Sequence, residues 1–126
     1  MVGDANPYTK AAGLIRLAGA SAALGKPDAA SHADQALRLA RERSFRVMEG
    51  LALTALADLA HASGDHAQAV RQAERALEIH RETGHRLGEA RTLRTLADAL
   101  GDPAYRERAM DVFDGLGLPD THGVVR

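Results

Sequence analysis

The chain lacks the residues that stabilise several other kinds of fold. It has no cysteine and no tryptophan among its 126 residues, and only 3% of the residues are aromatic. The absence of cysteine excludes structural disulfides and cysteine-ligated zinc sites, and it permits a reducing compartment. A chain of this length forms one ordinary domain and can bury enough surface to fold without such staples.

The chain also lacks an excess of either charge and any long apolar run. The chain has sixteen Lys and Arg residues and seventeen Asp and Glu residues, which gives a net charge of -1. Because direct nucleic-acid binders carry a basic excess, we expect no direct contact with nucleic acid. No uncharged apolar stretch approaches the 18 or so residues of a membrane span, and residues 1–7 carry no secretory signal. The sequence therefore predicts a cytoplasmic protein without a membrane contact.

Alanine and leucine dominate what is present, with 26 and 16 residues respectively. Alanine allows helices to approach closely, so this composition favours an all-α fold over a sandwich or barrel. Fourteen of the sixteen basic residues are arginine. Since Ala, Gly and Arg have GC-rich codons, we expect a bacterial source whose genome has a high GC content.

Helix-ending and helix-starting residues recur along the chain. Gly64-Asp65 carries both signals, since Gly suits the left-handed conformation at a helix end and Asp suits the N-cap of the next helix. Asn6-Pro7 is typical of a helix start, and Gly101-Asp102-Pro103 combines both signals. The sequence predicts six helices, near 7–24, 27–43, 46–63, 66–83, 87–100 and 103–115. It also predicts short tails at 1–6 and 119–126, and it leaves open a short seventh helix near the C-terminus.

The chain repeats itself. The segment 53–58 (LTALAD) recurs as 93–98 (LRTLAD), 40 residues later, and Gly25 corresponds to Gly64, 39 residues later. Each unit contains one pair of helices joined by a short turn, and such a pair cannot bury its apolar face alone. We therefore expect one domain over residues 7–118, built from stacked units at about 9–46, 47–86 and 87–118.

The order of large and small residues in the middle unit resembles the tetratricopeptide repeat. The matching positions are Leu53, Leu56, Ala57, Ala60, Gly64, Ala69, Ala73 and Ala76. The first unit matches through Leu14, Leu17, Ala18, Gly25, Ala29, Ala33 and Ala36, and the third through Leu93, Leu96 and Ala97. The period of 39–40 residues exceeds the usual value of about 34. This longer form is similar to the C-terminal repeats of Streptomyces antibiotic regulatory protein-type transcriptional regulators.

The resemblance implies an all-α, tetratricopeptide-like α-solenoid of three helical hairpins whose first helices line an inner groove. It also implies a non-catalytic module that binds a protein or peptide, as the regulatory or scaffolding domain of a bacterial transcriptional regulator. Two alternatives stay open, a sensor of small ligands or signalling peptides and an accessory protein to a biosynthetic enzyme. The implied partner-binding residues are Leu51, Thr54, Asp58, His61, Arg91, Arg94 and Asp98, joined by Ile15, Gly19 and Ala22.

The sequence offers little for catalysis, metal binding or a cofactor. No serine lies in a nucleophile elbow, and no phosphate-binding glycine loop is present. The histidine pairs His61/His66 and His80/His85 flank turns, and their five-residue spacing does not place both on one helical face. We interpret them as surface histidines. We therefore predict that the chain is not an enzyme, holds no metal and needs no cofactor.

The first predicted helix is apolar on nearly every side, although it is the outermost one. Leu14, Ile15 and Leu17 contribute most to this apolar surface. A helix that is apolar all round is normally buried. The sequence therefore predicts that either a second copy of the chain or an upstream domain covers this helix.

Overall fold

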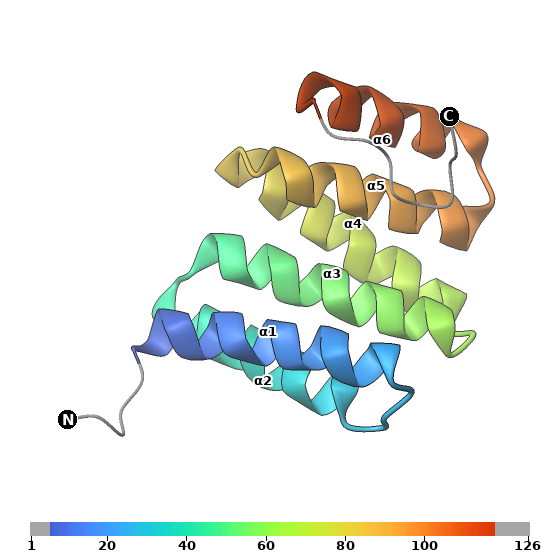
Figure 1. Ribbon diagram of the computed structural model, residues 1–126. Helices are drawn as coiled ribbons and strands as arrows, with labels where there is room; N and C mark the ends of the chain where they lie inside the picture. The colour runs from blue at the N-terminus through green and yellow to red at the C-terminus, as the bar shows by residue number, and fades with distance from the viewer. Residues whose placement is uncertain (1–5, 118–126) are drawn as a thin grey trace.

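The computed structural model describes residues 6–117, and these residues form six α-helices without a strand. The helices are α1 (Pro7–Ala23), α2 (Ala29–Arg43), α3 (Arg46–Ala62), α4 (His66–Thr83), α5 (Arg86–Leu100) and α6 (Pro103–Gly115) (Figure 1). The predicted all-α class and the six predicted helices are therefore confirmed for this part of the chain. The optional seventh helix and the tail at 119–126 lie outside the described residues.

The helix ends follow the signals that the sequence carries. Asp65 accepts a hydrogen bond from the Gln68 amide at 3.1 Å, and Gly64 adopts a φ of +86° at the preceding turn. That backbone conformation favours glycine because it has no Cβ to clash. Three helix ends differ from the prediction by one residue, and the largest difference is at α2, which begins at Ala29 and not at residue 27. Asp28 makes no side-chain capping bond there.

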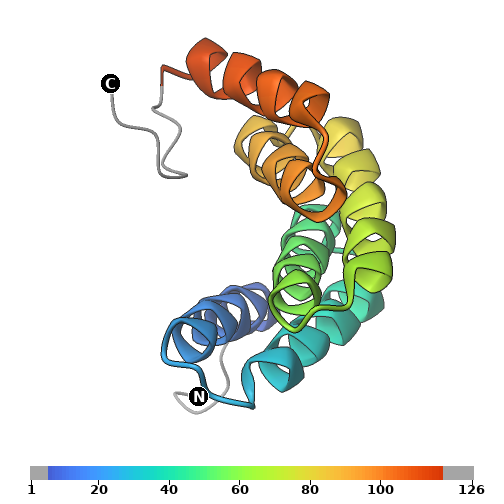
Figure 2. The ribbon, with the colours of Figure 1, turned by 90° about the vertical axis from the view of Figure 1, so that its right-hand side faces the viewer.

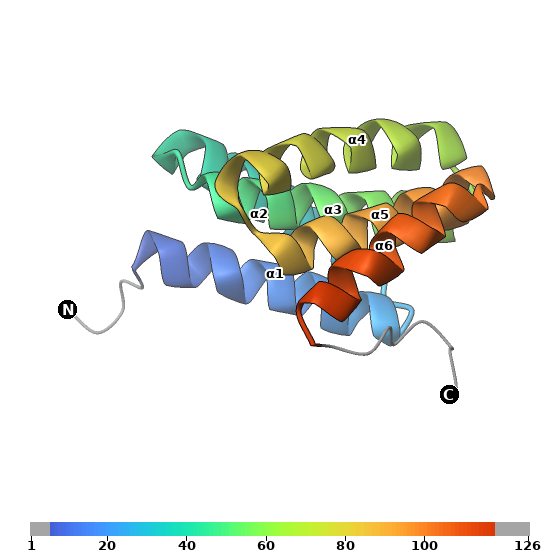
Figure 3. The same ribbon diagram turned by 90° about the horizontal axis from the view of Figure 1, so that it is seen from above.

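The helices pack as a stack of antiparallel pairs. Each helix contacts its neighbours in the chain, and α3 also contacts α1 and α5. No contact joins α2 to α4, or α4 to α6, within residues 6–117. Figure 2 shows the result, a curved stack with α1, α3 and α5 on its inner side and α2 and α4 on its outer side. Viewed down the stack in Figure 3, α4 and α1 lie on opposite sides.

Alanine fills the closest crossings, as the composition suggests. Ala57, Ala69 and Ala76 have no exposed surface, and Ala18 and Ala97 are also buried. Leucines and Ile79 fill the remaining space in clusters that cross from one hairpin to the next. Aromatic residues are few in these clusters, where Phe113 is buried, and small alanines at the crossings let the helices make close dispersion contacts instead.

An ionic arrangement joins consecutive hairpins, and it occurs twice. Glu49 accepts hydrogen bonds from Arg41 at 3.2 Å and from Arg46 at 2.8 Å. Forty residues later, Glu89 accepts bonds from Arg81 at 3.3 Å and from Arg86 at 2.8 Å. Both glutamates are buried. We call each set an Arg–Glu–Arg clamp, and it ties the end of one hairpin to the start of the next.

Candidate functional site: the inner groove

A hollow of about 510 Å³ lies on the inner side of the stack, and we call it the inner groove. Most of its lining is apolar, with Ile15 from α1 and Leu51 and Leu59 from α3 among small alanine and glycine residues. Asp58 from α3 and Arg91 from α5 are its charged residues. The odd-numbered helices therefore build a concave apolar surface that carries one group of each charge.

Four of the seven residues that the sequence predicts as partner-binding on the second and third units line this hollow, namely Leu51, Thr54, Asp58 and Arg91. Ile15, Gly19 and Ala22 from the first unit line it as well. These side chains come together because residues at a spacing of three or four share one face of a helix.

His61, Arg94 and Asp98 are not part of the lining. The Nδ1 atom of His61 lies 3.1 Å from Nδ1 of His66 across the α3–α4 turn. The guanidinium carbon of Arg94 lies 5.8 Å from the centre of the Phe113 ring, and Asp98 accepts a 2.5 Å hydrogen bond from Arg106. Arg94 and Asp98 therefore contact α6. His61 contacts His66 although the two histidines lie on different helices, because the turn between α3 and α4 brings them together.

Asp58 sits in a concave environment that changes its acidity. The carboxylate keeps contact with solvent, but the surrounding wall displaces much of the bulk water. This desolvation raises the pKa of Asp58 above its ordinary value. The Thr95 hydroxyl, which donates a hydrogen bond to Oδ1 at 2.6 Å, and the charge of Arg94 oppose that increase. Asp58 is therefore a positioned acceptor for a donor that enters the groove.

A buried polar network lies beneath Thr54. The Thr54 hydroxyl is 3.0 Å from Nε2 of His80 and 3.0 Å from the hydroxyl of Thr92. Thr54 donates its hydrogen to the Gly50 carbonyl at 2.9 Å, and Thr92 donates its hydrogen to the Gly88 carbonyl at 2.7 Å. Thr54 therefore accepts from His80, which places the His80 proton on Nε2. The network connects α3, α4 and α5 directly under the inner groove.

Two glycines make room for the His80 ring. A Cβ atom on Gly50 would lie 2.8 Å from the ring, and one on Gly88 would lie 2.4 Å from it. His80 is fully buried as a result, and its Nδ1 atom has no hydrogen-bond partner among the described residues. Burial lowers the pKa of His80 to about 4, with the nearby His85 as the second cause.

The burial of His80 corrects the sequence-based interpretation of this residue as a surface histidine. The signal was present, because His80 continues the spacing of Ala69, Ala73 and Ala76 along α4. That spacing defines a buried helix face. At this position the helical periodicity predicts burial correctly, although a turn follows four residues later.

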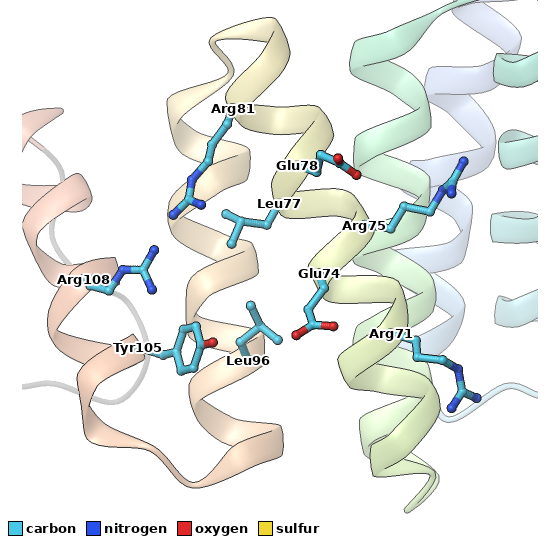
Figure 4. A pocket seen from close by; sticks show the side chains of 9 residues that line it. All are labelled: Arg71, Glu74, Arg75, Leu77, Glu78, Arg81, Leu96, Tyr105 and Arg108. Atoms are coloured by element: carbon cyan, nitrogen blue, oxygen red, sulfur yellow. The ribbon is translucent and has the colours of Figure 1, made fainter.

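A second hollow, of about 670 Å³, lies on the outer side between α4, α5 and α6 (Figure 4). Leu77 and Leu96 line it together with Tyr105, and arginines and glutamates surround them. Arg81 is already bonded to Glu89, and Arg75 lies 4.0 Å from Glu49. Several of the charged groups that surround this hollow already have partners within the chain, so the inner groove is the stronger candidate for binding.

The described residues contain no group of three or more His, Asp or Glu side chains that could hold a metal ion. Within the same range, no helix has the length and apolar character that a bilayer span requires. No family model matches the chain, and no match was found among curated proteins or among solved structures. The function must therefore be argued from the geometry and chemistry of the groove.

Proposed function

We propose that this chain is a non-catalytic interaction domain of the tetratricopeptide type, and that its inner groove binds a linear segment of a partner protein. The shape of the apolar lining carries the proposal. It extends from Ile15 to Ala23 on α1 and from Leu51 to Ala62 on α3, which correspond to about 12 Å and 16 Å of helix. An elongated surface of this length suits several consecutive residues of a peptide.

The charged groups of the groove give such a segment an orientation. Asp58 accepts from a basic side chain or an amide, and Arg91 binds a carboxylate through its planar guanidinium. Together with the apolar lining, they favour a peptide that has an apolar centre and opposite charges at its two ends. The domain fits a regulatory or scaffolding role in a bacterial transcriptional regulator, where occupancy of the groove biases neighbouring domains.

A small-ligand sensor is the second candidate. The groove volume of about 510 Å³ falls within the range of small-molecule pockets, which is roughly 300–1,000 Å³. The elongated lining favours the peptide over a compact metabolite. If binding requires only one residue of a peptide, the sensor becomes the better proposal.

A random linear-peptide display library tests the proposal with a defined probe. We expect enriched peptides to combine apolar residues with charges at both ends. Gly19→Leu should abolish their binding, because a Cβ at Gly19 meets no atom of the described residues within 4 Å and the added side chain would fill the groove. Arg91→Ala should weaken binding about tenfold, the loss expected for one charged contact of about 1.4 kcal/mol.

Two matched variants serve as controls for the peptide measurements. Gly115→Leu adds the same side chain in open space on α6, and Arg71→Ala removes an exposed arginine from α4. Both should bind the enriched peptides like the wild type. Equal binding by Gly19→Leu and the wild type, measured by titration calorimetry, would show that the peptides do not use the inner groove.

A further inference from the structure

A stripe of α1 remains uncovered on the side away from the inner groove. Gly13, Leu17 and Ala20 lie on one face of α1, and Leu24, the C-cap residue of α1, continues their spacing of three or four residues. We call this face the α1 stripe. Leu17 is 51% exposed and Leu24 is 71% exposed. Leu14 and Ile15, which the sequence also assigned to this surface, pack instead against the chain's own core.

The equivalent leucine positions in the other two repeat units are buried. Leu17 corresponds to Leu56 and Leu96, which are only 7% and 1% exposed. Those leucines lie on α3 and α5, and each of these helices contacts the two helices of the preceding hairpin. The α1 stripe is therefore a stacking face, and no helix among the described residues covers it.

Another repeat of the same kind is a poor match for this face. Consecutive hairpins here are tied by the Arg–Glu–Arg clamp, in which an arginine at the end of one hairpin meets a buried glutamate of the next. The repeat alignment places Lys10 where Glu49 stands in the second unit. An incoming arginine would meet an ammonium group, and like charges at this distance repel.

We propose that a second copy of this chain covers the α1 stripe, with the two α1 helices antiparallel around a twofold axis. In this register Leu24 of one copy lies opposite Gly13 of the other, and Leu17 lies opposite Ala20. Each large side chain thus faces a small residue, and the pairing is self-complementary, as a twofold interface requires.

Gly13 supports this register. A glycine inside a helix is less favourable than alanine, so it needs a reason. Residues 6–117 supply none, because a Cβ at Gly13 would meet none of their atoms within 4 Å. The open space above Gly13 provides room for Leu24 of the second copy.

Charge favours the antiparallel orientation over the parallel one. No acidic residue lies on α1, whereas Lys10 and Arg16 lie on it. A parallel pair would place the two Lys10 groups, and the two Arg16 groups, side by side. The antiparallel pair separates the Lys10 groups by about 25 Å and the Arg16 groups by about 8 Å along the axis, and it opposes the two helix dipoles. Ile15 and Gly19 remain on the groove side, so the dimer presents two open inner grooves and can bind a two-site partner with avidity.

Sedimentation equilibrium of the full chain, from low to high micromolar concentration, tests the dimer. We expect a monomer–dimer equilibrium. Leu17→Lys should raise the dissociation constant by about a hundredfold or more, because each dimer loses two buried leucines. Leu100→Lys changes a leucine of similar exposure, 47%, at the end of α5 and should leave the constant unchanged. A folded monomer at every concentration, or a dimer insensitive to Leu17→Lys, overturns the proposal.

Disulfide cross-linking tests the register, since the chain has no cysteine of its own. An equal mixture of Gly13→Cys and Leu24→Cys chains should form a disulfide between the two variants. Neither variant should cross-link alone, because like positions are about 16 Å apart in the antiparallel pair. Efficient cross-linking of each variant with itself would indicate a parallel pair and would overturn this arrangement.

Discussion

At the residue scale, the complete burial of the His80 side chain opposes the protonation of its ring. Its Nε2 proton is used by Thr54, and its Nδ1 atom lies in a space bounded by Gly50 and Gly88. A second proton would sit on Nδ1 without an acceptor among the described residues. Burial and the neighbouring His85 therefore lower the pKa to about 4, and the Glu89 carboxylate and the Gly50 carbonyl offset only part of this shift.

This shift predicts a loss of stability in acid. In the unfolded chain His80 titrates near its ordinary pKa of 6.5, whereas in the folded chain it titrates near 4. The unfolded state thus binds the proton first, so stability falls as the pH drops from about 6.5 to about 4 and then levels off for this group. The loss should reach at most about 3 kcal/mol.

Urea unfolding at a series of pH values measures this loss. His80→Gln keeps a donor for Thr54 but cannot titrate, so its stability should lose most of the pH dependence between pH 6.5 and 4. His66→Gln changes an exposed histidine and should retain the dependence. Parallel profiles for wild type and His80→Gln would contradict the assignment to His80.

At the element scale, the two Arg–Glu–Arg clamps determine how one hairpin meets the next. The glutamates are buried, while Arg41 and Arg81 are 47% and 46% exposed. Each carboxylate therefore depends on its arginines, whereas the arginines can also be solvated. The same geometry occurs 40 residues apart, which indicates that the clamp belongs to the repeat itself.

We expect Glu89→Gln to destabilise the chain by about 1–2 kcal/mol, because a charge-assisted bond becomes neutral while the side-chain shape is kept. Thermal and urea unfolding measure the change. The difference from the wild type should decrease at high salt, which screens the half-exposed arginines. Glu78→Gln, an exposed change on α4, should be nearly neutral. An equal effect of both variants would argue against a role for the clamp.

At the scale of the whole molecule, stability is distributed along the stack. The middle helix α3 contacts α1, α2, α4 and α5, whereas among the described helices α6 contacts only α5. In an array where each unit depends on its neighbours, the ends open before the centre. The proposed binding site, the inner groove, therefore involves the central helix of the stack, whereas the uncovered α1 stripe lies at one end.

Amide hydrogen exchange should follow this order, with α6 the least protected helix and α3 and α4 the most protected. The protection of α1 should rise with protein concentration in the wild type, because the proposed dimer covers its stripe. In Leu17→Lys it should stay constant. Uniform protection of all six helices would indicate a single cooperative unit, contrary to a stack held by nearest neighbours.

The sequence by itself determined the helices and their order. Glycine and capping residues punctuate the chain, and these signals act within a few residues, so α1 and α6 begin where Asn6-Pro7 and Asp102-Pro103 predict. Four of the seven partner-binding residues predicted on the second and third units do line the inner groove, because a repeat determines which helix face is turned inward. Local signals and periodicity suffice for both inferences.

Only the tertiary structure decided the remaining features, because they depend on contacts between distant segments. It placed His80 between Gly50 and Gly88, and it directed Arg94 and Asp98 toward α6. It also left Leu17 exposed, whereas its repeat equivalents Leu56 and Leu96 are buried, although all three hold the same place in the sequence pattern. A pattern specifies which face of a helix is apolar, and packing decides which neighbour, if any, covers it.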